Sequence, residues 1–324
     1  MPENVQEQLT KHLTDVHSIE EQALQQLRKA PDIAGDEELA RVFKRHLAET
    51  EDQERQVRDR LAARQADPSK LKDLAGRAGG FGMVIFARSQ PDTPGKLTAH
   101  AYAYEHLELA AYDLLALVAD RAGDLETAAV ARAIRLQESA MADRLASNFD
   151  RAVDASLRIL ESDDLEAQLT SYLADAHAIE SQALQLLEQA PGIARESDLA
   201  KVFRDHLEET RSQQAIVAAR LEAHDAKPSR FKDVLLRLGG VNVGAFFGAQ
   251  PDTPAKLAGF AFAFEHLEIA AYELLQRVAR RAGDEETVRV AERIATEERA
   301  AAAAIRGQFE PALDAALRAQ GVTA

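Results

Sequence analysis

The chain has 324 residues, with 54 acidic and 39 basic side chains, a net charge of −15, and neither cysteine nor tryptophan. Because a single hydrophobic core rarely grows beyond roughly 250–300 residues, the length predicts two domains. The acidic balance argues against nucleic-acid binding, since it repels a phosphate backbone. The lack of cysteine excludes disulfides and thiolate ligands, so any metal ion must be held by histidine and carboxylate.

The composition predicts an all-α protein. Hydrophobic residues make up 46% of the chain, and glycine (16) and proline (10) are too scarce for a loop-rich β protein. No apolar run approaches the roughly 18 residues that a membrane span requires, and the N-terminal segment MPENVQEQLTKHL is too polar for a signal peptide. We therefore predict a cytoplasmic protein with no membrane partner.

The sequence repeats itself at an offset of 160 residues. LTDVHSIEEQALQQL at 13–27 matches LADAHAIESQALQLL at 173–187, and AYAYEHLELAAY at 101–112 matches AFAFEHLEIAAY at 261–272. This period is far longer than the roughly 20–50 residues of a solenoid unit, so each copy is a whole domain. We predict a tandem duplication with domains at 1–158 and 159–324.

The first half of each copy predicts two long helices. In copy 1 they span about 4–29, ending before Pro31, and about 36–64, ending before Pro68. The segment that follows, at 66–92, carries several glycines and predicts a short helix with a crossover.

Two further long helices follow the crossover. The third begins at Thr93-Pro94, an N-cap followed by proline at the first helical position, and closes at Gly123. Asp124 caps the fourth, which runs to about 148, and a shorter helix at 149–160 leads into copy 2. Copy 2 repeats these signals. Two hairpins joined by one long crossover predict a four-helix bundle in each copy.

All four long helices place acidic side chains on their apolar faces. Glu20, for example, shares the helical stripe of Leu13 and Leu24. The inward polar residues of copy 1 are His17, Glu20, His46, Glu49, Glu105, Glu108 and Glu138. Their counterparts in copy 2 are His177, Glu180, His206, Glu209, Glu265, Glu268 and Glu298.

These side chains need compensation, because a buried ionised group is costly unless it is neutralised or paired. The same helix faces carry no inward lysine or arginine, which leaves protons or metal ions. Four carboxylates and two histidines from four helices are the ligand inventory of a dinuclear iron or manganese site. Oxygen-rich ligands with imidazole favour Fe(II) or Mn(II) over copper or structural zinc.

The order of the histidines departs from the usual Glu-x-x-His of such sites. Here histidine precedes glutamate, at 17–20 and at 46–49. Ligation by His17 and His46 is still allowed, since residues three apart share a helix face. Both are equally compatible with hydrogen-bonded histidines of the core.

Other matched side chains have simpler interpretations. His106 lies off the acidic stripe, and we predict it to be a surface or interface partner of Asp113. Tyr112 is expected to pack in the core with its hydroxyl hydrogen-bonded, and beside a metal site it could donate to a ligand. Asp124 is interpreted as a cap only.

At these residues the chain resembles the YciE/YciF ferroxidase-like family of the ferritin-like superfamily. The matching segments are HLAET at 46–50, HLEET at 206–210, EHLELAAY at 105–112, EHLEIAAY at 265–272, IExQAL at 19–24 and 179–184, and the acidic segments around Glu138 and Glu298. The resemblance covers nearly the whole chain twice. It implies two tandem ferritin-like four-helix bundles, each with a metal centre, in stress-associated bacterial proteins.

The resemblance also implies ligands and partners. By position the ligands are Glu20, Glu49, Glu105 or Glu108, and Glu138, with their equivalents in copy 2. Members of the family commonly pair as homodimers, so the two copies are expected to dock as an internal pseudo-dimer. A further homodimer of whole chains stays open.

The function predicted from these residues is that of a stress protein with a carboxylate-bridged di-iron, or di-manganese, centre. Two metals per domain would meet dioxygen or peroxide in ferroxidase- or peroxidase-type chemistry. The alternative is a non-enzymatic structural or metal-sequestering helical protein. A weaker hypothesis, a small-molecule binder, rests on the apolar segments GFGMVIF at 80–86 and VNVGAFF at 241–247, which core packing explains better.

Overall fold

The computed structural model describes residues 4–65, 94–159, 165–195, 197–226 and 253–322. Within these ranges every regular element is a helix and no strand occurs, which confirms the all-α class. Copy 1 contains α1 (Val5–Leu27), α2 (Ala30–Ile33), α3 (Glu37–Ala63), α6 (Pro94–Arg121), α7 (Leu125–Ala146) and α8 (Phe149–Ile159). Copy 2 contains α9 (Leu165–Ala194), α10 (Asp198–Ala223), α13 (Thr253–Ala282), α14 (Glu285–Arg306) and α15 (Phe309–Ala319).

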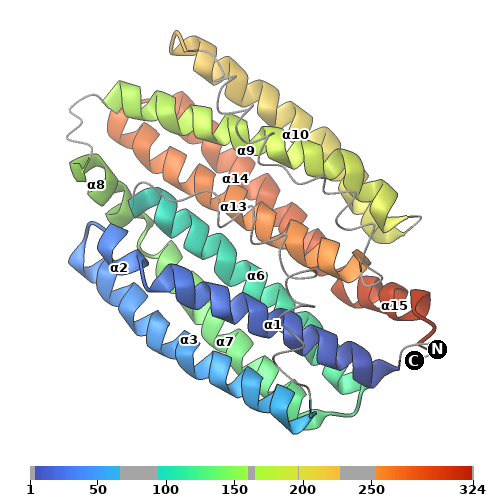
Figure 1. Cartoon of the computed structure of the whole chain (residues 1–324). Helices are drawn as coiled ribbons and strands as arrows, with labels where there is room; N and C mark the ends of the chain where they lie inside the picture. The colour runs from blue at the N-terminus through green and yellow to red at the C-terminus, as the bar shows by residue number, and fades with distance from the viewer. Residues whose placement is uncertain (1–3, 66–93, 160–164, 196, 227–252, 323–324) are drawn as a thin grey trace.

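The four long helices of each copy pack as a bundle. In copy 1, α1 contacts α3 and α6, while α7 contacts α6 and α3, and copy 2 repeats this with α9, α10, α13 and α14. Figure 1 shows the long helices running along a common direction, with α6 and α13 between the outer helices. The interior is apolar: Phe43, Leu115 and Ile134 are fully buried in copy 1. The faces predicted from the helical period are the faces that meet.

The predicted end of the third long helix and the predicted cap of the fourth are confirmed. The Asp124 carboxylate accepts a hydrogen bond from the backbone N–H of Thr127 at 3.0 Å. Gly123 has a φ of +70°, the left-handed conformation that glycine adopts at the end of a helix. Asp284 caps α14 in the same way. Thr93 and the crossover at 66–92 lie outside the described residues.

The predicted end of the first helix before Pro31 is confirmed in copy 1, although a short second helix follows directly. α1 ends at Leu27, and Pro31 lies in the first turn of α2, where a proline costs no helical hydrogen bond. In copy 2, Pro191 lies inside α9, which runs on to Ala194. The predicted helix end before the proline is therefore wrong in copy 2 only.

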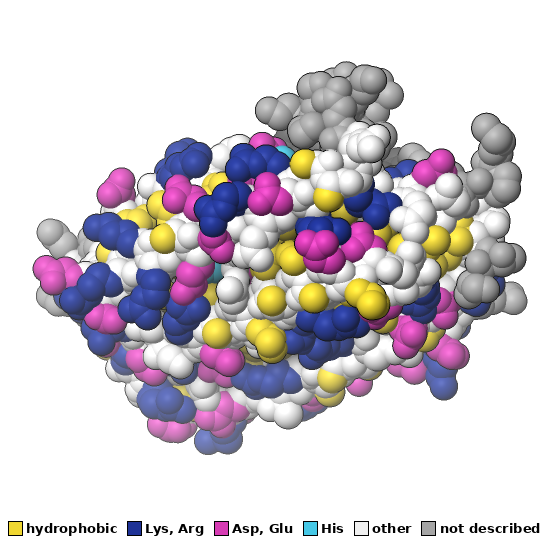
Figure 2. Space-filling view, turned by 90° about the horizontal axis from the view of Figure 1, so that it is seen from below, with side chains coloured by type: hydrophobic (Ala, Val, Ile, Leu, Met, Phe, Trp, Pro, Cys, Tyr) yellow, Lys and Arg dark blue, Asp and Glu magenta, His cyan; other side chains and the backbone are white. Residues whose placement is uncertain are grey.

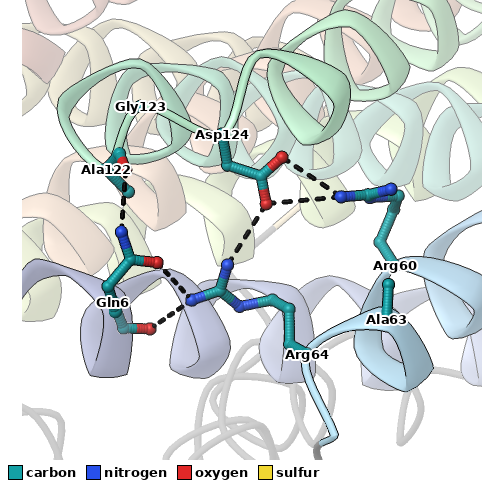
Figure 3. A pocket seen from close by; sticks show the side chains of 7 residues that line it. All are labelled: Gln6, Arg60, Ala63, Arg64, Ala122, Gly123 and Asp124. Atoms are coloured by element: carbon teal, nitrogen blue, oxygen red, sulfur yellow. Dashed lines mark hydrogen bonds and ion pairs between the residues drawn. The ribbon is translucent and has the colours of Figure 1, made fainter.

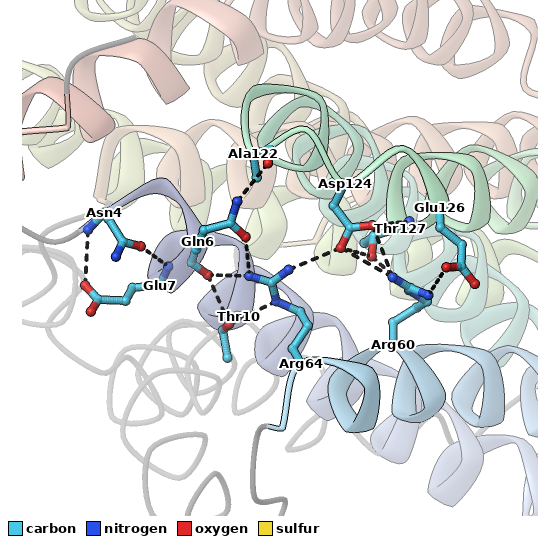
Figure 4. A network of polar contacts seen from close by, with 10 residues as sticks. All are labelled: Asn4, Gln6, Glu7, Thr10, Arg60, Arg64, Ala122, Asp124, Glu126 and Thr127. Atoms are coloured by element: carbon cyan, nitrogen blue, oxygen red, sulfur yellow. Dashed lines mark hydrogen bonds and ion pairs between the residues drawn. The ribbon is translucent and has the colours of Figure 1, made fainter.

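A polar network ties three helices of copy 1 together at one end of the bundle (Figure 4). Asp124 accepts hydrogen bonds from Arg60 at 3.1 Å and from Arg64 at 3.2 Å, both at the end of α3. Arg64 also donates to the backbone oxygen of Gln6 in α1, at 2.9 Å. A pocket is lined by these residues (Figure 3). The guanidinium groups of Arg60 and Arg64 in its wall are bound to Asp124 and Gln6. Asp124 therefore joins helices as well as capping one.

The two copies pack against each other mainly through α6 and α13. Several ion pairs between the copies recur with the copies exchanged. The pairs are Lys96–Asp175 at 3.6 Å with Lys256–Asp15 at 2.9 Å, and Arg121–Asp314 at 2.6 Å with Arg281–Asp154 at 2.7 Å. Reciprocal pairing of this kind is the form of a two-fold symmetric interface.

His106 and His266 stack on each other within this interface. Their ring centroids lie 3.5 Å apart at an interplanar angle of 15°, and each Nδ1 lies 2.8 Å from the backbone oxygen four residues earlier. Burial lowers the pKa of both, that of His266 to about 4. The predicted pairing of His106 with Asp113 is wrong, because Asp113 instead accepts a hydrogen bond from Arg306 of the other copy, at 3.1 Å.

Gly259 lets α13 lie close to α6. A Cβ at this position would lie 3.4 Å from the Cβ of Ala110 and 3.7 Å from Leu114. We expect Gly259→Leu to lower the free energy of unfolding by roughly 1–3 kcal/mol, because the added side chain overpacks this contact. Denaturant unfolding measures the effect. Gly192→Leu is the control, since a Cβ there meets nothing within 4 Å; equal losses would contradict close packing of the copies.

Positive and negative side chains alternate on the visible surface of the protein. On the face shown in Figure 2, lysine and arginine side chains are interspersed with aspartate and glutamate. Surface pairs such as Arg41 with Glu38, at 2.6 Å, show the same local balance. Among the helices that the structure describes, none has the length and hydropathy needed to cross a membrane.

Candidate metal centre

Each copy brings one histidine and three glutamates together inside its bundle. In copy 1 these are His46 of α3, Glu105 and Glu108 of α6, and Glu138 of α7. In copy 2 they are His206, Glu265, Glu268 and Glu298. Each residue offers one ligand atom within 4.8 Å of the others, and all eight are at most 3% exposed. Bulk water therefore does not stabilise their charges.

The Nε2 atom of His46 lies inside this cluster. Nε2 lies 3.2 Å from Glu105 and 3.6 Å from Glu138, while Nδ1, on the other side of the ring, lies 3.3 Å from Glu49. The corresponding distances for His206 in copy 2 are 2.9, 3.3 and 3.3 Å. A carboxylate on the outer nitrogen is the usual partner of a metal-ligating histidine, because it fixes the ring orientation.

Glu20 of α1 adds a fourth buried carboxylate to copy 1. It is fully buried and accepts a hydrogen bond from the hydroxyl of Tyr112, as Glu180 does from Tyr272 in copy 2. Tyr112 therefore donates a hydrogen bond to a candidate ligand. This is the second of the two roles predicted for it, beside simple packing in the core. Burial raises the pKa of both Glu20 and Glu180 to about 8.

Several carboxylate oxygens of the cluster have no hydrogen-bond partner among the described residues. They include both oxygens of Glu138 and one each of Glu105 and Glu108. Burial raises the pKa of Glu108 and Glu138 well above the ordinary range, and neighbouring carboxylates add to the effect. Burial alone would lower the pKa of His46, but Glu105 raises it to about 9. Unpartnered oxygens around one imidazole form a donor set that suits a divalent cation.

Two predicted ligands lie outside this group in copy 1. Glu49 is on the outer side of His46, and Arg144 of α7 binds its two oxygens at 3.1 Å each. Hydrogen bonds from His46 and Arg144 lower the pKa of Glu49 to about 2. His17 instead has its Nε2 3.0 Å from Glu54 of α3. Direct ligation by Glu49 or His17 stays a prediction.

Copy 2 is not identical at these outer positions. Glu209 contacts His206 but is 57% exposed, and Ala304 stands where copy 1 has Arg144. His177 is buried in α9, and Gln214 replaces Glu54. Arg144 has no basic counterpart in copy 2, so the residues that both copies retain do not include it. The signal that could have found it was the difference at this position.

The fold and the cluster together define a class: a tandem helical-bundle protein whose halves each contain a buried histidine–carboxylate group that can hold a metal ion. One family model matches the chain twice, over residues 4–158 and 164–318. The chain belongs to this family, which is described as "Domain of unknown function (DUF892)". The two consecutive matches agree with a tandem duplication. No solved structure matches the chain.

Proposed function

We propose that each copy binds a dinuclear iron centre, or a dinuclear manganese centre, and that the protein reacts Fe(II) with dioxygen or peroxide. The observation that carries this proposal is the set of unpartnered carboxylate oxygens around His46 and around His206. With Glu20, copy 1 supplies four buried carboxylates and one imidazole from all four helices of its bundle. An oxygen-rich set of this kind favours iron or manganese.

The proposal gives each group a role. Glu20, Glu105, Glu108 and Glu138 would hold the ions through carboxylate oxygens, and His46 through Nε2. The hydroxyl of Tyr112 orients Glu20, and the carboxylate of Glu49 orients the ring of His46. Burial keeps bulk water away from these groups. A bound pair of such ions supplies two-electron redox chemistry.

The resemblance to YciE/YciF ferroxidase-like proteins supports the same proposal. The proposal includes a ferritin-like bundle in each copy, a role in stress and a cytoplasmic location. It also includes domain boundaries at 1–158 and 159–324. The family matches at 4–158 and 164–318 support these boundaries. An internal pseudo-dimer is supported by the reciprocal ion pairs between the copies. Pairing of whole chains is a further expectation.

Metal sequestration is the alternative that a specific observation favours. All four cluster residues of each copy are at most 3% exposed, so a bound ion would be enclosed by protein. Enclosure slows the exchange of both metal and substrate. A protein of this kind would bind iron without turning over peroxide.

Anaerobic Fe(II) titration, followed by exposure to air or peroxide, distinguishes these functions. The proposal predicts about two Fe(II) per copy, a rise in near-ultraviolet absorbance on oxidation, and iron-dependent consumption of peroxide. Tight binding of Fe(II) without consumption of dioxygen or peroxide would favour sequestration. If neither Fe(II) nor Mn(II) binds, both functions are rejected.

A further inference from the structure

The two copies differ in the charge next to the histidine of the cluster. In copy 1, Arg144 pairs with Glu49 through two hydrogen bonds of 3.1 Å. In copy 2 the corresponding residue of α14 is Ala304, and it is exposed. Glu209 is 57% exposed, and within the described ranges His206 is its only ion-pair partner. A guanidinium therefore pairs with the outer carboxylate in copy 1, whereas no guanidinium among the described residues pairs with Glu209 in copy 2.

The other charges near the clusters are more evenly matched. Copy 1 has Glu54, which lies 3.0 Å from His17. Copy 2 has glutamine at that position but carries Glu297, which lies 2.8 Å from Arg293. Each of these acids acts electrostatically on the buried glutamate of the first helix in its copy. The exchange preserves the number of flanking acids. Arg293 stands where copy 1 has Ala133 and pairs with Glu297, whereas Arg144 pairs with the carboxylate that contacts the histidine of the cluster.

The outer carboxylate reaches the cluster through the imidazole. Glu209 lies 3.3 Å from Nδ1 of His206, whose Nε2 lies 2.9 Å from Glu265. A negative carboxylate on the outer nitrogen raises the basicity of the imidazole as a ligand, and it also attracts a cation directly. A guanidinium that binds both oxygens of that carboxylate weakens both effects.

We propose that the two metal sites of the chain are inequivalent. The site of copy 2, with its unshared Glu209, binds a divalent metal first and more tightly, and Arg144 lowers the affinity of the site in copy 1. Arg144 is a positioning residue, because it acts through Glu49 and His46. This inference rests on the proposed metal centre and specifies which half of the chain fills when metal is limiting.

Two single-site chains test the inference. Glu105→Gln with Glu138→Gln leaves only the site of copy 2, and Glu265→Gln with Glu298→Gln leaves only the site of copy 1. Binding is measured with Mn(II) alone, from the electron paramagnetic resonance signal of the free ion. The chain that keeps the site of copy 2 is expected to bind Mn(II) roughly ten-fold more tightly, the scale typical of changes in the partners of ligating residues.

Exchange of the unmatched residue shows whether Arg144 is the cause. In the chain that keeps only the site of copy 1, Arg144→Ala is expected to tighten Mn(II) binding roughly ten-fold. In the other chain, Ala304→Arg is expected to weaken it by a similar factor, and this exposed position tolerates the change. If Arg144→Ala reduces helicity, the result with Ala304→Arg decides.

The outcomes separate the two proposals. Equal Kd values for the two single-site chains, or affinities that neither exchange alters, would overturn the inequivalence of the sites. Failure of both single-site chains to bind Mn(II) would instead reject the metal centre itself.

Discussion

Removal of bound metal is expected to destabilise the protein much more near pH 8 than near pH 5. In the metal-free protein, burial raises the pKa of Glu20 from 4.5 to about 8, and it raises the pKa of Glu108 and Glu138 as well. Between these values the folded state holds protons that the unfolded state has released. The contribution of these groups to the stability of the metal-free protein is therefore greatest below pH 4.5. For Glu20 this contribution is lost as the pH rises through about 8.

The histidine of the cluster adds to the effect with the same sign. Because Glu105 raises the pKa of His46 from 6.5 to about 9, its contribution is present below pH 6.5 and is lost as the pH rises through about 9. Glutamates with a lowered pKa, such as Glu49 at about 2, act only below their ordinary value of 4.5. Burial lowers the pKa of His106 and His266 below 6.5, so their contribution to stability rises up to pH 6.5 and opposes the trend there. The loss is therefore read between pH 6.5 and about pH 8.

Thermal unfolding of chelator-treated protein across this range measures the loss. Each unit of pKa change corresponds to about 1.4 kcal/mol, so the fall in stability per copy is expected to be on the order of several kcal/mol. Addition of Fe(II) under anaerobic conditions, or of Mn(II), should restore the Tm near pH 8, because the cation replaces the protons. A Tm of the metal-free protein that stays constant or rises between about pH 6.5 and pH 8 would contradict this account.

Replacement of Glu138 and Glu298 by leucine is expected to abolish metal binding and to stabilise the metal-free protein near pH 8. Each glutamate is fully buried, and neither of its oxygens has a hydrogen-bond partner among the described residues. An apolar side chain of similar size removes the cost of burying a polar group without a hydrogen bond, which is typically about 1–3 kcal/mol per site. Metal analysis and denaturant unfolding of the chelator-treated double variant measure the two effects.

Exposed glutamates on the same two helices provide the matched control. Glu126→Leu with Glu286→Leu changes residues whose side chains are 76% and 55% exposed. This control should bind metal as the unmodified protein does and gain no stability. The account is contradicted if the Glu138→Leu, Glu298→Leu protein retains its metal, or if its metal-free form unfolds more easily than the unmodified protein.

Much of the fold follows from the sequence because helical periodicity and capping are local. The 160-residue repeat and the left-handed glycine at 123 could be read without knowledge of tertiary contacts. The helical period predicts that Glu105, Glu108, Glu138 and His46 lie on inward faces, and the structure brings these four side chains together. The apolar faces of four helices have one interior to share, so inward residues at similar depth must meet.

The positions of the other predicted side chains could not be derived from the sequence, because they depend on contacts between residues far apart in the chain. Glu49 follows His46 by one helical turn, but whether it reaches the cluster or the edge of the bundle depends on how the four helices pack, and its pairing with Arg144 joins it to another helix. In the same way His17 is held by Glu54 of α3. The stacking of His106 on its counterpart depends on how the copies pack, and helical periodicity defines a face without naming its partner.

Counting the metal bound to the protein tests the central claim most directly. The chain is purified without chelator, reconstituted anaerobically with Fe(II), freed of excess metal and measured by elemental analysis. We expect about four iron ions per chain, two in each copy, and a marked loss in the Glu138→Leu, Glu298→Leu protein. Less than half an ion per chain after reconstitution would contradict the claim that cations neutralise the buried carboxylates.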